Sequence, residues 1–212
     1  GNTINVYGSD PGFSVASNGG THTAWEDVAL IREIPGAVIC DPADDVQMEW
    51  IIKEFLKMEG IHYVRSNRKA VRNVYKKGSS FKIGQGNILK EGKDILIIAA
   101  GQLVSEALDC AEELEKEGYS VEVIDMFTIK PLDEKLLIKE AKGKSKIVTI
   151  ENHSIYGGLG SAVSEVIAEN GISVPVKRIG VKEKFGQVGT AEFLQEEFGL
   201  TAKQIKETIC QF

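Results

Sequence analysis

Short apolar segments alternate with longer amphipathic segments along this chain of 212 residues, and the alternation limits the possible folds more than any other feature. Ile95 to Ala99 is an almost continuous apolar run of strand length, as expected for a strand covered on both faces. Residues 102–117 follow with the apolar spacing of an amphipathic helix, which we expect to end at Gly118. Strands that alternate with helices predict an α/β protein with mostly parallel sheets.

We expect two such α/β units. The first has predicted strands at 3–8, 37–40 and 61–65, and predicted helices at 21–33 and 43–58. The second has predicted strands at 95–99, 121–125, 146–150 and 174–179, and predicted helices at 102–117, 133–141, 158–169, 190–198 and 201–210. The polar, basic and glycine-containing stretch 66–93 predicts a linker. We place the boundary inside it, which gives units 1–78 and 79–212.

The composition excludes several classes of protein. A formal net charge of -6 argues against a nucleic-acid partner, because the phosphate backbone is recognised by clustered Lys and Arg. No apolar run approaches the ~18 residues that a membrane span needs. The three cysteines are far apart and odd in number, which indicates no disulfide framework and a reducing, cytoplasmic location. The chain also begins directly with a strand-like segment, which is typical of a fragment.

The segment from Ser9 to Gly36 is the first candidate for chemistry. It reads SDPGFSVASNGGTHTAWEDVALIREIPG, a glycine-rich loop followed by helical spacing. Such a loop lets backbone N–H groups and side chains converge on a polar ligand. His22 lies at the junction, where it can donate to a ligand oxygen or move a proton near neutral pH. Taken alone, the pattern favours a capping or packing histidine over a ligand-binding one.

This segment resembles the transketolase loop that ordinarily reads SHAGLTVGEDGPTHQ…ED(I/V)ALMRAIPN and is followed by a strand and PAD. The resemblance implies that His22 contacts the hydroxyls of the donor sugar and is a catalytic residue. It also implies that Asn18, which replaces a usual aspartate, binds the C2 hydroxyl. Asp10 stands where a phosphate-facing histidine is usual, and its charge would repel a sugar phosphate. We therefore expect a departure from the usual sugar-phosphate specificity, with an unphosphorylated or different acceptor.

A second candidate follows the predicted strand at 61–65. Transketolases and deoxyxylulose phosphate synthases carry a similar strand end, IRxxR, whose last arginine holds the substrate phosphate. Arg65 and Arg68 have this spacing. An arginine suits the task because its planar group bonds a phosphate through two hydrogen bonds. We expect Arg68 to bind the substrate and Arg65 to have a structural role.

The segment ENHSIYGGLGSAVSEV, from Glu151 to Val166, partly resembles a dinucleotide-binding turn. The third glycine of that pattern is replaced by Val163, so the signal is weak. The segment also resembles the C-terminal domain shared by transketolases, deoxyxylulose phosphate synthases and pyruvate dehydrogenase beta subunits (VEEHSIIGGLGSAVAEVL). In that domain its glycines allow close packing of helix on strand. We expect Glu151 and His153 to be structural.

The resemblance covers nearly the whole chain and implies a truncated pyrimidine-binding domain followed by a complete transketolase C-terminal domain. It further implies a thiamine diphosphate- and Mg²⁺-dependent enzyme that transfers a two-carbon ketol unit from a ketose to an aldose. The chain lacks the sequences that hold the cofactor and metal, so we predict no cofactor-binding or metal-binding residues here and no activity alone. The expected partners are an N-terminal transketolase domain or subunit, a second copy in a homodimer, and sugars or sugar phosphates. The alternatives are part of a deoxyxylulose phosphate synthase, an oligomerisation module without activity, and a nucleotide-binding domain.

Overall fold

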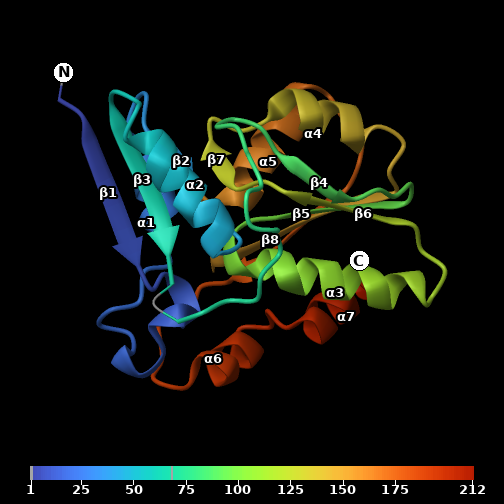
Figure 1. Cartoon of the computed structure of the whole chain (residues 1–212). Coiled ribbons are helices and arrows are strands. Elements are labelled where there is room, and N and C mark those ends of the chain that lie inside the picture. Colours follow the sequence, from blue (N-terminus) through green and yellow to red (C-terminus); the bar gives the residue numbers. More distant parts are fainter. Residues whose placement is uncertain (1, 68) are drawn as a thin grey trace.

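Two β-sheets organise the protein, which confirms the predicted α/β fold (Figure 1). The computed structural model describes residues 2–67 and 69–212. The first sheet has the order β1-β3-β2-β7 and the second the order β4-β6-β5-β8-β9. The strands are β1 (Ile4–Ser9), β2 (Val38–Cys40), β3 (Ile61–Ser66), β4 (Asn87–Lys90), β5 (Ile95–Ala99), β6 (Val121–Asp125), β7 (Thr128–Lys130), β8 (Lys146–Ser154) and β9 (Val176–Val181).

Helices cover both faces of the second sheet, with α3 and α7 on one face and α4 and α5 on the other (Figure 1). The alternating side chains of β5 explain this arrangement, because successive residues of a strand point to opposite faces. Ile95 and Ile97 belong to the core that includes α3 and α7, whereas Leu96 and Ile98 belong to the core that includes α4 and α5. The helices are α1 (Asp27–Arg32), α2 (Asp45–Phe55), α3 (Val104–Glu115), α4 (Glu134–Ala141), α5 (Leu159–Glu169), α6 (Ala191–Glu197) and α7 (Ala202–Gln211), with short 3-10 helices η1 (Gly12–Asn18) and η2 (Gly101–Leu103).

Strand β7 joins the two halves of the chain. It follows β6 of the second sheet but pairs antiparallel with β2 of the first. Phe127, just before β7, is fully buried in a core that also contains Ile51 and Phe55 of α2 and Val64 of β3. The Lys130 ammonium donates to two carbonyl oxygens at the end of α1. The C-terminal half therefore supplies the last strand of the N-terminal sheet.

The first predicted helix, 21–33, is wrong at its start, because α1 begins at Asp27. Local hydrogen bonds hold the preceding residues in turns. The Thr23 hydroxyl donates to the Gly19 carbonyl oxygen at 3.0 Å, and the His22 N–H donates to the same oxygen at 3.0 Å. Such side-chain bonds compete with helix formation. The predicted linker 66–93 contains β4, and β7 was also not expected.

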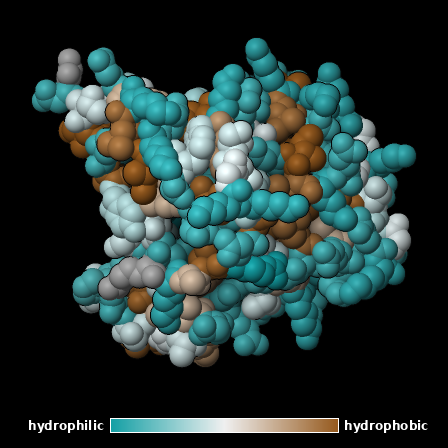
Figure 2. All heavy atoms as spheres, in the orientation of Figure 1, coloured by the Kyte–Doolittle hydropathy of each residue, from teal (hydrophilic) through white to brown (hydrophobic). Residues whose placement is uncertain are grey.

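Strand β1 forms one edge of the first sheet, since only β3 pairs with it in the described structure. Its apolar side chains are unusually open: Ile4 is 51% and Tyr7 54% exposed. Figure 2 shows hydrophobic residues gathered at the end of the molecule where β1 and β3 lie.

Within the described residues, no helix is long and apolar enough to cross a membrane. All three cysteines are free thiols, as predicted.

Candidate substrate site

A loop of residues 11–26, here called the Gly-rich loop, presents Asn18 and His22 to solvent. It starts with η1 and turns at Gly19, which has a φ of 69° that favours glycine. The hydroxyl of Thr21 lies 2.9 Å from Nδ1 of His22, so the ring is held from one side. Both side chains are exposed, and they are four positions apart in the sequence.

The C-terminal half of the chain forms the seat of this loop. A methyl group of Val188 lies 2.5 Å from where a Cβ on Gly19 would be, and the Gly186 carbonyl oxygen lies 2.6 Å from such a position on Gly20. Glycine is therefore required at both places by close approach. At the other end of the loop, the Ser154 N–H donates to the Trp25 carbonyl oxygen at 2.8 Å. The loop is exposed at its tip and supported underneath.

Asp10 lies at the carboxyl end of β1, away from the tip of the Gly-rich loop. It is only 5% exposed, and its N–H donates to the Ser66 carbonyl oxygen at 2.6 Å. Its φ of 53° is a left-handed conformation that aspartate tolerates better than most residues. Asp10 lines a cavity of about 220 Å³ together with Asn67, Lys69 and side chains of α3 and α6. Asn18 and His22 are not among the described residues that line it.

Arg65 has the structural role that the sequence predicted. It is 1% exposed and bonds two carboxylates: Asp27 at 2.9 and 3.2 Å, and Asp41 at 2.8 Å. These charges and hydrogen bonds hold the pKa of Arg65 above its usual range in spite of its burial. Tyr63 also donates to Asp27, at 2.7 Å. Arg68, the predicted anion ligand, lies outside the described residues.

His153 lies beside this cluster and is buried in the neutral form. Its Nδ1 donates to the Ser154 carbonyl oxygen at 2.7 Å, and its Nε2 lies 3.8 Å from the Asp27 carboxylate. Burial and the neighbouring Arg65 guanidinium lower the pKa of His153 to about 4, against the weaker opposite effect of Asp27. Burial also raises the pKa of Asp41, although Arg65 opposes this. The cluster connects β3, α1 and β8, and it is a structural element.

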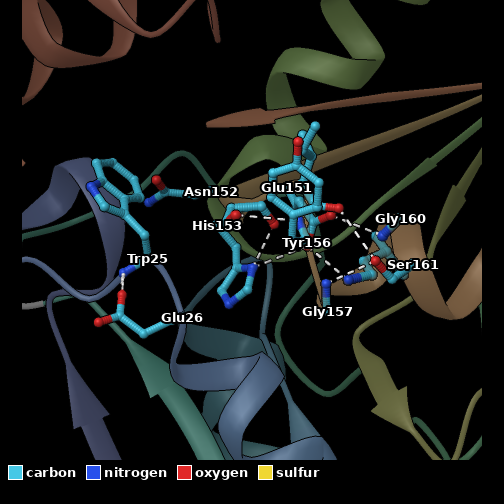
Figure 3. A network of polar contacts seen from close by, with 12 residues as sticks. Trp25, Glu26, Glu151, Asn152, His153, Tyr156, Gly157, Gly160 and Ser161 are labelled. Carbon is cyan, nitrogen blue, oxygen red and sulfur yellow. Dashed lines mark hydrogen bonds and ion pairs between the residues drawn. The ribbon is translucent and has the colours of Figure 1, made fainter. Parts of the chain in front are cut away.

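Glu151 explains why the glycine-rich turn before α5 is not a nucleotide site. Its carboxylate accepts the N–H groups of Leu159 at 2.7 Å and Gly160 at 2.8 Å, at the start of α5 (Figure 3). These are the donors that a bound phosphate would need. A Cβ on Gly158 would lie 2.0 Å from the same carboxylate. The alternative of a nucleotide-binding domain is therefore not supported, and the glycines serve close packing.

Metal-binding groups are absent from the part of the chain that the structure describes: no three His, Cys, Asp or Glu side chains gather in a way that could hold an ion.

The structure separates the predicted site residues into two places. Asn18 and His22 share the exposed tip of the Gly-rich loop, and Asp10 lines the cavity at its base. Sequence reasoning missed Asn152 and Asp41. The only signal was their position, because Asp41 directly follows β2 and Asn152 lies near the end of β8, where polar residues gather in parallel sheets.

Comparison with known proteins gives the class of this fold. Residues 84–205 match the family model of the transketolase C-terminal domain. The chain is 41% identical over 202 residues, 95% of its length, to the 6-deoxy-6-sulfo-D-fructose transketolase subunit SqwH of Clostridium sp. (strain MSTE9). It is 34% identical over its whole length to an apulose-4-phosphate transketolase subunit of Phocaeicola vulgatus. It covers 62% and 67% of these relatives, respectively.

A solved structure agrees with these relatives. The chain superimposes on a split gene transketolase, described as an inactive beta4 tetramer, with a TM-score of 0.88, 36% identity and coverage of 98% of this chain and 65% of that one. The chain therefore belongs to the transketolase family. It contains the C-terminal domain of that family over residues 84–205, preceded by an N-terminal α/β unit.

Proposed function

We propose that the chain is the C-terminal part of a transketolase that is divided between two polypeptides, and that the assembled enzyme transfers a two-carbon ketol unit from a ketose to an aldose. The observation that carries this proposal is the position of His22. It matches the histidine that the family uses on the donor sugar, and it stands exposed on a loop that is otherwise firmly supported. In this proposal His22 and Asn18 bind donor hydroxyls, and Arg68 binds an anionic end of the substrate.

Thiamine diphosphate with Mg²⁺ would supply the nucleophilic carbon of this reaction. Among the described residues, no three His, Cys, Asp or Glu side chains gather in a way that could hold an ion, and the sequences that hold the cofactor in the family do not occur in the chain. We therefore assign cofactor binding to an N-terminal partner subunit, and to this chain the positioning of the sugar. The relative described as an inactive beta4 tetramer supports a need for a second kind of subunit and suggests self-association of this part. Within this chain itself, we propose that the first α/β unit ends at residue 78 and the second begins at residue 79.

We propose the substrate class from the charges around Asp10. The cavity at the base of the Gly-rich loop is lined by three carboxylates, of Asp10, Glu106 and Glu192, and by two cationic side chains, of Lys69 and Arg72. This excess of negative charge disfavours a dianionic phosphate more than a monoanionic or neutral group. The two relatives differ in this respect, since their names give a sulfonated ketose and a sugar phosphate. We propose a ketose donor whose far end is not phosphorylated. The sulfonate of the 41% identical relative is one such end.

Reconstitution tests the proposed function. The chain, extended so that its pyrimidine-binding domain is whole, would be combined with the N-terminal subunit of a split transketolase. Two-carbon transfer would be measured with fructose, fructose 6-phosphate and 6-deoxy-6-sulfofructose as donors. We expect transfer that requires both polypeptides, thiamine diphosphate and Mg²⁺. Calorimetry on the chain alone should show no tight cofactor binding. A stable complex with bound cofactor but no transfer from any ketose would contradict the proposal.

A further inference from the structure

Asn152 of the C-terminal half grips the start of the Gly-rich loop with both polar atoms of its side chain. It lies near the end of β8 and is 3% exposed. Its Nδ2 donates to the Pro11 carbonyl oxygen at 3.0 Å, and its Oδ1 accepts the Phe13 N–H at 3.1 Å. Figure 3 shows this side chain directed toward Trp25 and away from Glu151, as expected for neighbours on a strand.

The loop is shaped to receive this amide. Between the two gripped residues, Gly12 has a φ of 61°, and a Cβ there would lie 2.1 Å from Oδ1 of Asn152. The Gly12 N–H also donates to the Ala24 carbonyl oxygen at 3.0 Å, which joins the first residues of the loop to the last. A restraint on residues 11–13 therefore acts at both ends of the loop. The exposed tip lies between these ends.

Two further contacts hold Asn152 and the loop in register. The Arg65 guanidinium donates to the Asn152 carbonyl oxygen at 2.9 Å, so the strand end is attached to the buried ion-pair cluster. The Gln102 amide, at the start of the α3 region, donates to the Ser14 hydroxyl at 2.7 Å. Two side-chain amides of the C-terminal half thus bond the start of the loop, and of these Gln102 also lines the cavity that contains Asp10.

We propose that Asn152 is a positioning residue, which fixes the Gly-rich loop so that Asn18 and His22 meet the substrate in one arrangement. The inference rests on the proposed function for the roles of those two residues. It gives the C-terminal domain a part in the reaction, although it carries none of the expected substrate ligands. Only an amide fits this place, because it supplies one donor and one acceptor to the two backbone groups, whereas a carboxylate accepts only.

Asn152→Asp tests this inference with little change of shape. The variant keeps the acceptor for Phe13 and places a carboxylate oxygen against the Pro11 carbonyl. Asn170→Asp is the matched control, since Asn170 also donates its side-chain amide to a backbone carbonyl, at 2.9 Å from Val166 at the end of α5. Gln102→Leu is a milder second variant in case Asn152→Asp does not fold. Hydrogen exchange would be followed by mass spectrometry on the chain alone, and transfer kinetics on the reconstituted enzyme.

We expect amide exchange in residues 11–24 to rise about tenfold in Asn152→Asp, and less in Gln102→Leu, with the rest of the chain and Asn170→Asp unchanged. We expect kcat/KM for the ketose to fall about 10- to 100-fold while cofactor affinity stays constant. Exchange that is unchanged in the loop, or raised equally along the chain, would overturn the inference. Faster loop exchange with normal kcat/KM would overturn it as well. If no partner gives activity even with the wild-type chain, the proposed function fails, and the exchange comparison alone decides whether Asn152 fixes the loop.

Discussion

His22 offers the most direct test at the scale of single residues. In the reconstituted enzyme, we expect His22→Ala to lower kcat/KM by about 10- to 1,000-fold, because it removes a hydrogen bond that strengthens in the transition state. The side chain is exposed and contacts Thr21, so the unfolding midpoint of the variant should stay close to that of the wild type. Steady-state kinetics and thermal unfolding check the two expectations. Unchanged kinetics would remove His22 from the site.

Asp10 tests the proposed substrate class. Asp10→His should raise the preference for a phosphorylated ketose over its unphosphorylated analogue, because it removes a negative charge from the cavity. The left-handed backbone at this position, with a φ of 53°, also accommodates histidine and asparagine comparatively well. Asp10→Asn therefore serves as a control for charge alone and should give part of the effect. Competition between the two sugars measures the preference, and an unchanged ratio in both variants would place Asp10 outside the substrate site.

At the scale of elements, β7 predicts how the C-terminal part behaves in isolation. The polypeptide 79–212 would lose β2, the strand partner of β7. It would also lose the apolar neighbours of Phe127, namely Ile51, Phe55 and Val64. An unpaired edge strand beside an exposed aromatic side chain promotes association. We expect this polypeptide to bind hydrophobic dyes and to self-associate more than the full chain does.

Sedimentation and dye fluorescence would measure that difference. The full chain is the control, and Phe127→Ser in the shorter polypeptide should reduce dye binding if Phe127 is the exposed group. A shorter polypeptide that stays monomeric and binds no dye would mean that β7 folds back onto its own sheet.

Elements with strong local patterns could be predicted from the sequence, and those that depend on distant partners could not. The apolar run of β5 and the amphipathic pattern of α3 gave these elements almost to the residue. Strand β7 has only three residues and exists because β2 lies beside it, a contact between residues about 90 positions apart. Strand β8 continues to Ser154, past the predicted end, because it carries polar residues that bind the loop and α5.

The candidate site divides in the same way. His22 and Asn18 could be proposed as site residues because their loop has a distinctive pattern, and Arg65 could be assigned a structural role. The contacts of Asn152 with the loop could not be predicted from the sequence, because its partners are backbone atoms some 140 residues away. A backbone N–H or carbonyl is present whatever the residue type, so such a hydrogen bond leaves no recognisable partner side chain in the sequence.

At the scale of the whole molecule, His153 links stability to pH. Its pKa is about 4 in the folded chain, against about 6.5 in an unfolded one. Above pH 6.5 both states are neutral. Between pH 6.5 and 4 the unfolded state binds the proton and the folded state does not, so the free energy of unfolding falls as pH falls through this window. Solvent reaches little of this ring, and we expect a loss of about 2 kcal/mol from this group by pH 4.5.

Urea unfolding of the wild type and of His153→Gln at pH 7 and pH 4.5 would measure this contribution. The variant should lose about 2 kcal/mol less than the wild type between the two values, since all other titrating groups are shared. Parallel losses in both proteins would mean that His153 accepts a proton while buried, which the adjacent Asp27 carboxylate would then stabilise.

The pairing of β7 with the first sheet also affects where a gene for such a protein can be divided. The segment between β3 and β4 looks like a natural place to break the coding sequence, because it joins two units of different sheets. A break there would oblige two separate polypeptides to find each other before either sheet was whole. The relatives from Clostridium and Phocaeicola each match this chain across both units. The pairing of β7 with β2 therefore disfavours a division of the gene at this point.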